Sequence, residues 1–299
     1  VVALKDANLT IDRGEIVALV GANGAGKSTF VKILTGALKA DTGHVWIRGQ
    51  ERRVGSPAEA RRSGLVPVYQ EPSLIPDLDV ADNLQLGGTP VEAFQHWVAE
   101  LGIVGLRLDD MIGHLPLATL RILDLARALA SEPDVLLLDE MTAALPTDLV
   151  ERVLKTVRAQ ADKGQAVIYI SHRFAEIAEI CDRVTVLRDG LTVGDLPIEP
   201  GVEEKVVELM LGAALGEGPA QATATMATDR ADTRLRVKNL AAAPKLADVS
   251  LELRRGEVLG VVALEGQGQD ELFDVLAGMA RPTGGTVELD GKAVSFSHP

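Results

Sequence analysis

The chain has 299 residues, of which 46% are hydrophobic and 24% charged, as in globular proteins with one large or two ordinary domains. Its net charge of −13 argues against a protein that coats nucleic acid, because such proteins gather Lys and Arg into clusters. No apolar run approaches the roughly 20 residues of a membrane span, and the single Cys181 excludes an internal disulfide, which fits a reducing compartment.

A strand, a loop and a helix are predicted near the start of the chain. Residues 1–4 fall within a strand region, residues 15–20 predict a buried strand, and residues 27–37 repeat apolar side chains on one helical face. The loop at 21–29 fits the phosphate-binding pattern G-x-x-x-x-G-K-[ST] without a mismatch. This pattern predicts backbone N–H groups around nucleotide phosphates, Lys27 at the outer phosphates and the Ser28 hydroxyl on Mg²⁺. The predicted phosphate-binding residues are Gly21, Ala22, Asn23, Gly24, Ala25, Gly26, Lys27, Ser28 and Thr29.

The middle of the first half changes from strands to helices. Gln70 follows a short apolar strand, and its amide is a candidate ligand of Mg²⁺ or of an attacking water, although alone it would indicate nothing. From about residue 74 to residue 129 the pattern is mostly helical, with apolar residues of 122–129 on one face. Because strands and helices alternate elsewhere, we predict an α/β domain with a largely parallel sheet and a helical insertion.

Two later apolar runs end in residues suited to nucleotide hydrolysis. The run at 136–138 leads into Asp139, placed to hold Mg²⁺ directly or through water, and Glu140, placed to polarise an attacking water. The run at 167–170 leads into His172, which would sense or stabilise the γ-phosphate. Alone, the two acids could equally cap a strand, but Lys27 favours the functional interpretation. We expect the remaining histidines to be structural or exposed: His44, His96, His114 and His298.

The chain also repeats itself at an offset of 242 residues. Residues 6–15 match 248–257 at Asp, Leu, Arg, Gly and Glu, and further matches follow up to residue 291. A repeat of this length indicates duplicated domains. We therefore predict a first domain at 1–212, a flexible linker at 213–234 and a second, truncated domain at 235–299.

Taken in order, these motifs resemble those of an ATP-binding cassette (ABC) ATPase. They are the loop at 21–29, Gln70, 136–140, 143–145 and His172. The resemblance covers 1–212 and, more weakly, 235–299, and the stretches around Gln70 and His172 are similar to the subfamily that imports monosaccharides with two cassettes in one chain. It implies a P-loop NTPase fold of the ABC type with a helical subdomain, then the start of a degenerate second cassette. It implies catalytic roles for Glu140, His172, Lys27 and Gln70, and metal binding by Ser28, Gln70 and Asp139.

The resemblance implies an ATPase subunit that hydrolyses ATP with Mg²⁺ and energises a membrane importer, in the first place for a monosaccharide, with nucleosides as other cargo. The implied partners are transmembrane permease subunits, a second cassette and, indirectly, an extracytoplasmic sugar-binding protein, at the cytoplasmic face of the cell membrane. No nucleic acid is expected. One alternative is a soluble ABC-type ATPase acting on ribosomes or DNA, which would need basic arms or a long coiled coil. Another is a regulatory nucleotide-binding module without turnover.

Two stretches depart from the family's pattern. The signature close to L-S-G-G-Q corresponds to residues 115–120, where Pro116 and Ala118 replace the Ser and the key Gly. Pro116 offers neither an N–H nor a hydroxyl group, so we expect a poor grip on the γ-phosphate of the opposite cassette. In the second phosphate loop, at 263–271, a Lys, a Ser and a Thr are replaced by Gln269, Asp270 and Glu271. These defects would face each other in the family's head-to-tail dimer, so we expect one hydrolytic site per full-length chain; the alternative is neutral drift.

Overall fold

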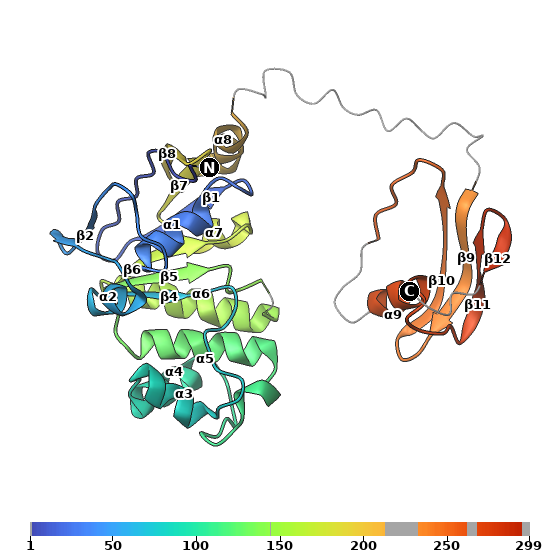
Figure 1. Ribbon diagram of the computed structural model, residues 1–299, viewed down its shortest axis with the longest axis horizontal. Helices are drawn as coiled ribbons and strands as arrows, with labels where there is room; N and C mark the ends of the chain where they lie inside the picture. Colours follow the sequence, from blue (N-terminus) through green and yellow to red (C-terminus); the bar gives the residue numbers. More distant parts are fainter. Residues whose placement is uncertain (1, 144, 213–232, 262–267, 295–299) are drawn as a thin grey trace. The chain divides into compact units, whose positions relative to one another are not determined.

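The computed structural model describes residues 2–143, 145–212, 233–261 and 268–294 (Figure 1). The chain divides into two compact units, residues 1–216 and 217–299. The predicted linker at 213–234 lies almost wholly outside the described residues. Within the described segments, no helix is long and apolar enough to cross a membrane.

A six-stranded sheet in the order β4-β5-β6-β1-β7-β8 forms the centre of the first unit (Figure 1). The strands from β4 to β7 are all parallel to their neighbours, and β8 is antiparallel to β7. The prediction of a largely parallel sheet is therefore confirmed. The strands are β1 (Ile16–Gly21), β4 (Leu65–Val68), β5 (Val135–Asp139), β6 (Ala166–Ile170), β7 (Arg183–Arg188) and β8 (Leu191–Pro197). A separate hairpin consists of β2 (Val45–Ile47) and β3 (Gln50–Arg52).

Helices cover both faces of this sheet, which explains why its central strands are apolar throughout. On one face, α1 (Lys27–Leu34) inserts Phe30 and Val31 into a cluster with Leu19 and other strand residues. The alternate residues of the strands, such as Ala18, point into a larger cluster on the other face. The helices that contribute to this larger cluster include α5 (Leu117–Leu129), α6 (Thr147–Asp162), α7 (Phe174–Ile180) and α8 (Val202–Leu211).

The region from 74 to 129 is helical, as its periodicity indicates. It contains α3 (Val80–Gly87), α4 (Val91–Glu100), the short 3-10 helix η1 (Ile112–His114) and α5, whereas α2 (Pro57–Arg62) precedes it. Asp79 caps α3, because its carboxylate accepts a hydrogen bond of 2.8 Å from the backbone N–H of Asp82. The buried apolar side chains of α4 and α5 lie in the larger core cluster, so this region shares the core of the sheet.

Three local expectations differ from the structure. Residues 2–8 form only one isolated bridge, between Asp6 and Leu191. The reason is that their backbone groups form hydrogen bonds with the turn between β7 and β8. Helix α1 ends at Leu34 rather than near residue 37, since Gly36 has a φ of +71° and its backbone lies close to Ser56. Helix α5 begins at Leu117, inside the stretch expected to precede the helix, because Pro116 is well tolerated just before a first turn.

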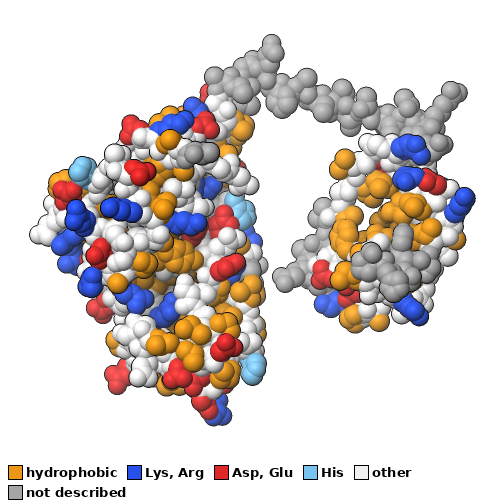
Figure 2. All heavy atoms as spheres, viewed as in Figure 1, with side chains coloured by type: hydrophobic (Ala, Val, Ile, Leu, Met, Phe, Trp, Pro, Cys, Tyr) orange, Lys and Arg blue, Asp and Glu red, His pale blue; other side chains and the backbone are white. Residues whose placement is uncertain are grey.

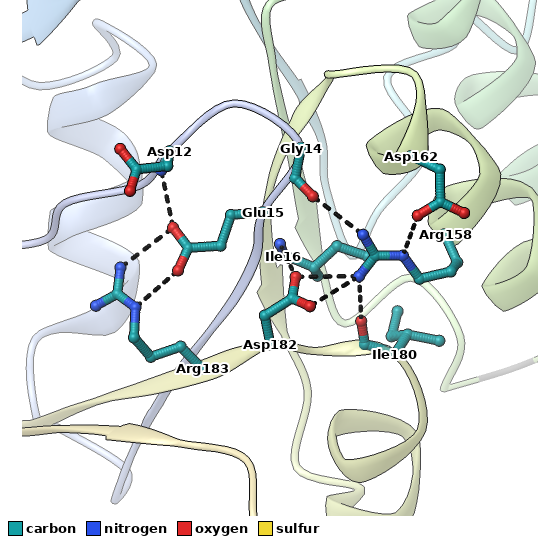
Figure 3. A network of polar contacts seen from close by, with 9 residues as sticks. All are labelled: Asp12, Gly14, Glu15, Ile16, Arg158, Asp162, Ile180, Asp182 and Arg183. Atoms are coloured by element: carbon teal, nitrogen blue, oxygen red, sulfur yellow. Dashed lines mark hydrogen bonds and ion pairs between the residues drawn. The ribbon is translucent and has the colours of Figure 1, made fainter.

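A polar network fixes the amino-terminal ends of β1 and β7 (Figure 3). Asp182 accepts hydrogen bonds from the backbone N–H of Ile16 and from the guanidinium of Arg158 on α6. Arg158 also donates to the carbonyl of Gly14 at 3.0 Å, and Arg183 pairs with Glu15 at 2.8 Å. These bonds hold α6 and two strands together at the sheet edge opposite the carboxyl ends of the strands.

The second unit repeats elements of the first at the expected offset. Its described residues contain an antiparallel sheet in the order β10-β9-β11-β12 and the helix α9 (Gln269–Leu276), which corresponds residue for residue to α1. Leu246 lies against Gly268 just as Leu4 lies against Gly26, also 242 positions apart. The strands are β9 (Thr233–Ala242), β10 (Leu246–Arg254), β11 (Gly284–Leu289) and β12 (Lys292–Val294). The two units thus share these elements at an offset of 242 residues.

Candidate functional site

The predicted site residues follow the carboxyl ends of neighbouring parallel strands. Gln70 follows β4, Asp139 ends β5, His172 follows β6, and the loop at 21–29 begins at the last residue of β1. The carboxyl ends of parallel strands meet at one edge of a sheet, which is where open α/β sheets bind ligands. The sheet order therefore brings residues from four distant parts of the sequence to one edge.

The phosphate-binding loop makes a sharp turn that depends on its glycines. Gly24 and Gly26 have φ angles of +83° and +108°, a region that other residues rarely adopt. The turn is closed by a hydrogen bond of 3.1 Å from the N–H of Ala25 to the carbonyl of Ala22, and helix α1 begins at Lys27. The loop thus precedes a helix N-terminus directly, where backbone N–H groups and the helix dipole attract anions.

The amino-terminal segment closes over one side of this loop. A Cβ atom at Gly26 would lie 2.6 Å from Leu4 Cδ2 and 3.0 Å from the carbonyl oxygen of Ala3. The N–H of Gly190 donates to the carbonyl of Ala25 at 3.0 Å, so the turn after β7 supports the loop from the same side. Close backbone approach, and not only φ, therefore requires glycine at position 26.

We expect Gly26→Ala to destabilise the first unit more than Gly43→Ala does. Both glycines have φ near +105°, but a Cβ atom at Gly43 would meet nothing within 4 Å. The change at Gly43 should cost about 1 kcal/mol through backbone strain alone, and the change at Gly26 about 1–3 kcal/mol more through crowding. Urea unfolding of the two variants measures the difference, and equal losses would show that the contact with Leu4 and Ala3 is unimportant.

Lys27 lies among the polar groups of this edge. Its ammonium donates to the carbonyl of Gly21 at 2.6 Å and to that of Ala22 at 3.3 Å. Partial burial lowers the pKa of Lys27, while the charges of Glu140 and Asp139 oppose this shift. Burial and the neighbouring Glu140 raise the pKa of Asp139, and Lys27 counteracts them. The charges of Lys27 and of the two acids thus act on one another at this edge of the sheet.

Glu140 is held in an unusual backbone conformation just after β5. Its φ is +49°, its N–H donates to the carbonyl of Ile170 at 2.9 Å, and its own carbonyl accepts from Arg121 at 3.3 Å. A positive φ at a residue other than glycine often marks a functional position. The conformation places Glu140 Oε1 3.7 Å from Nδ1 of His172, so the structure brings these two predicted residues together.

No hydrogen bond joins Gln70 to Lys27 among the described residues, and the segment that follows Gln70 bonds to the helical region. The side chain of Gln70 is exposed, and three residues later the N–H of Ser73 donates to the buried carboxylate of Asp124 on α5 at 3.1 Å. Asp124 also pairs with Arg127, and burial raises its pKa. The segment after Gln70 is therefore tied to α5, the helix that begins in the stretch 115–120.

Known proteins match this arrangement. The sequence pattern of the family described as "ABC transporter" matches residues 4–143. A Ribose import ATP-binding protein RbsA of Halalkalibacterium halodurans is 37% identical over 309 residues, which cover 99% of this chain and 61% of that protein. The RbsA 1 protein of Streptomyces coelicolor is 39% identical over 99% of this chain and 60% of its own length.

Solved structures agree with the sequence matches. An ATP-binding cassette of an ABC transporter in its ADP conformation has a TM-score of 0.61 and 25% identity, over 70% of this chain and 92% of that one. The dimeric post-hydrolysis state of another cassette, bound to ADP and Pi, has a TM-score of 0.58 and 25% identity, over 66% of this chain and 91% of that one. Residues 4–143 of the chain are an ABC transporter domain. The chain spans about three fifths of the length of the RbsA proteins that it matches.

The ABC cassette fold makes this edge of the sheet a candidate nucleotide site. The family's cassettes bind ATP or ADP, and the loop at 21–29 has the backbone geometry for such phosphates. No group of three or more His, Cys, Asp or Glu residues in the described segments is arranged to hold a metal ion alone. The donor set fits Mg²⁺ nonetheless, because two coupled acids and the exposed Ser28 hydroxyl are hard oxygen ligands and phosphates would supply the rest.

Both departures from the ABC pattern lie at helix starts. Pro116 occupies the N-cap position of α5, and no side-chain hydrogen bond caps this helix. In the second unit, residues 263–267 lie outside the described part, whereas Asp270 and Glu271 stand in the first turn of α9. Two acids at a helix N-terminus repel phosphate at short range. This repulsion is the physical reason to expect that the second loop binds phosphate poorly.

Three residues of this ABC cassette were not found from the sequence. Arg121 bonds the carbonyls of Glu140 and Met141, Asp124 bonds the N–H of Ser73, and Glu176 accepts four hydrogen bonds behind His172. The only available signal was a charged residue on an otherwise apolar helical face. Arg121, Asp124 and Glu176 are all buried, and such burial needs partners that the sequence alone does not identify.

Proposed function

We propose that this chain binds Mg-ATP in its first unit and hydrolyses it to drive a membrane importer of a monosaccharide, with ribose as the first candidate. The observation that carries the proposal is the convergence of Lys27, Asp139, Glu140 and His172 at one edge of the sheet. The names of the RbsA relatives support import of a sugar. Because the chain covers only part of their length, the activity of the whole protein is included in the proposal.

The proposed steps of hydrolysis follow from where negative charge develops on the phosphates. The loop at 21–29 and the start of α1 hold the phosphates through backbone N–H groups, and Lys27 exchanges its carbonyl partners for the outer phosphates. Glu140 orients the attacking water, and His172, next to Glu140, contacts the γ-phosphate. When bound, Mg²⁺ neutralises charge on the phosphates, and Ser28, Asp139 and Gln70 would hold it.

The helical region supports docking to permease subunits. Figure 2 shows apolar side chains between charged ones over the part of the first unit where Figure 1 draws α3, α4 and α5. The exposed apolar residues of this region include Ile75, Leu86, Met111 and Leu117. Through Ser73 and Asp124, a movement of the segment after Gln70 would reach α5 directly. We infer that this connection couples the nucleotide site to membrane partners at the cytoplasmic face, which receive cargo from an extracytoplasmic binding protein.

Only one of two composite sites is proposed to hydrolyse ATP. The first phosphate loop has the Lys and the Ser that the pattern requires. The second phosphate loop instead carries Asp270 and Glu271 near the phosphate position. Pro116 and Ala118 would face that second loop in a head-to-tail pair. Turnover at the first loop is therefore expected to depend on the signature of the opposite cassette.

The proposed function is tested by transport. In cells that carry the gene, a chromosomal Lys27→Ala change should abolish uptake of one radiolabelled monosaccharide, tested with ribose first. Lys32→Ala is the matched control, because Lys32 lies exposed on the same helix and should leave uptake unchanged. Unaltered uptake of every monosaccharide in the Lys27→Ala strain would contradict import of a sugar. A loss confined to nucleoside uptake would identify the other cargo class.

A further inference from the structure

A single carboxylate lies behind the pair Glu140 and His172. Glu176, on α7, is 5% exposed and belongs to no predicted motif. Its Oε2 accepts hydrogen bonds from Tyr169 at 2.7 Å, Thr142 at 2.8 Å and Ser171 at 3.1 Å. Its Oε1 accepts from Arg173 Nη1 at 3.1 Å. Four donors thus converge on one buried acid.

Three of these donors come from the two loops that carry the proposed catalytic pair, and the fourth, Tyr169, lies on β6. Thr142 lies two residues after Glu140, whereas Ser171 and Arg173 are the neighbours of His172 on both sides. The N–H of Arg173 donates to Ser171 Oγ at 3.0 Å, which closes the loop around His172. His172 itself is 65% exposed, and within the described structure its side chain has no other partner than Glu140. The position of His172 therefore depends on its neighbours.

We propose that Glu176 is a positioning residue, which fixes the loop of His172 against the loop of Glu140 so that both groups meet the γ-phosphate and its water. This inference rests on the proposed function. Glu176 is buried and acts through its four donors. Such a residue contributes by holding the reacting groups in place. A displacement of these groups by about 1 Å can reduce a rate by roughly 100-fold.

The test separates positioning from stability. In Glu176→Gln, an amide N–H₂ group faces hydroxyl and guanidinium donors, so the loops shift while the phosphate loop remains intact. The affinity for Mg-ATP, measured by calorimetry, should change less than about twofold, and the single-turnover rate of ATP cleavage should fall about 10- to 100-fold. The matched control is Asp182→Asn, a carboxyl-to-amide change in the network at the opposite edge of the sheet (Figure 3). It should lower stability and leave the rate unchanged.

A milder pair of variants serves if Glu176→Gln fails to fold. Thr142→Val keeps the shape but removes one donor and should lower the rate, whereas Thr142→Ser keeps the hydroxyl and the rate. Equal rates in these two variants would overturn the inference, as would a normal rate in Glu176→Gln or an equal fall in Asp182→Asn. If the unaltered chain binds Mg-ATP but never cleaves it, the proposed function fails first and the inference fails with it.

Discussion

Lys27→Ala is expected to abolish measurable Mg-ATP binding by the first unit. Lys27 is the only cation that the loop at 21–29 contains, and its ammonium lies within 2.6 Å of the carbonyl of Gly21. Removing it leaves the phosphates opposite Asp139 and Glu140 without a compensating charge from the loop. A charge-assisted contact in a partly buried site contributes about 2–3 kcal/mol, and the uncompensated acids add repulsion, so the affinity should fall at least about 100-fold.

Isothermal calorimetry with Mg-ATP measures this affinity directly. Lys32→Ala controls for the loss of a positive charge from α1, because Lys32 is exposed in the last turn of the same helix and should bind nucleotide normally. Circular dichroism must show that both variants keep the fold. Unchanged affinity in Lys27→Ala would remove the basis for assigning the nucleotide to this loop.

The strand ends were predictable because their signals are local. A phosphate loop between an apolar strand and a helix needs only adjacent residues, and Asp139 and Glu140 follow directly from a run of apolar side chains. The parallel order of the strands then brings these points to one edge without further information. For the same reason the repeat at an offset of 242 indicated a second domain, and α9 starts at Gln269, 242 residues after the start of α1 at Lys27.

The supporting residues were not predictable because their partners are distant in sequence. Glu176 bonds Thr142, 34 positions away, and Arg121 bonds the carbonyl of Met141, 20 positions away. Neither spacing corresponds to a helical or strand period. The start of α5 was misjudged for a different reason: the stretch 115–120 was placed ahead of the helix, although proline is tolerated at a helix start. Sequence patterns thus predicted the groups that we propose to meet the ligand, while the structure identified the groups that hold them.

Glu140→Gln is expected to separate binding from cleavage. The side chain of Glu140 is 28% exposed and faces His172, whereas its backbone is fixed by the N–H bond to Ile170 and by Arg121. The amide fills the same volume and keeps these backbone bonds, so the loop at 21–29 should bind Mg-ATP with normal or slightly higher affinity. Loss of a general base typically reduces the rate about 100- to 10,000-fold.

Single-turnover cleavage of radiolabelled ATP, with the chain in excess over nucleotide, measures this rate even if turnover is slow. Glu179→Gln is the matched control, because Glu179 is exposed on α7 and a change there should leave cleavage unchanged. A variant that binds Mg-ATP and accumulates it uncleaved would agree with a water oriented by Glu140. Cleavage by Glu140→Gln at the unaltered rate would mean that another group orients the water, and since Asp139 is coupled to Lys27 it would be the next carboxylate to examine.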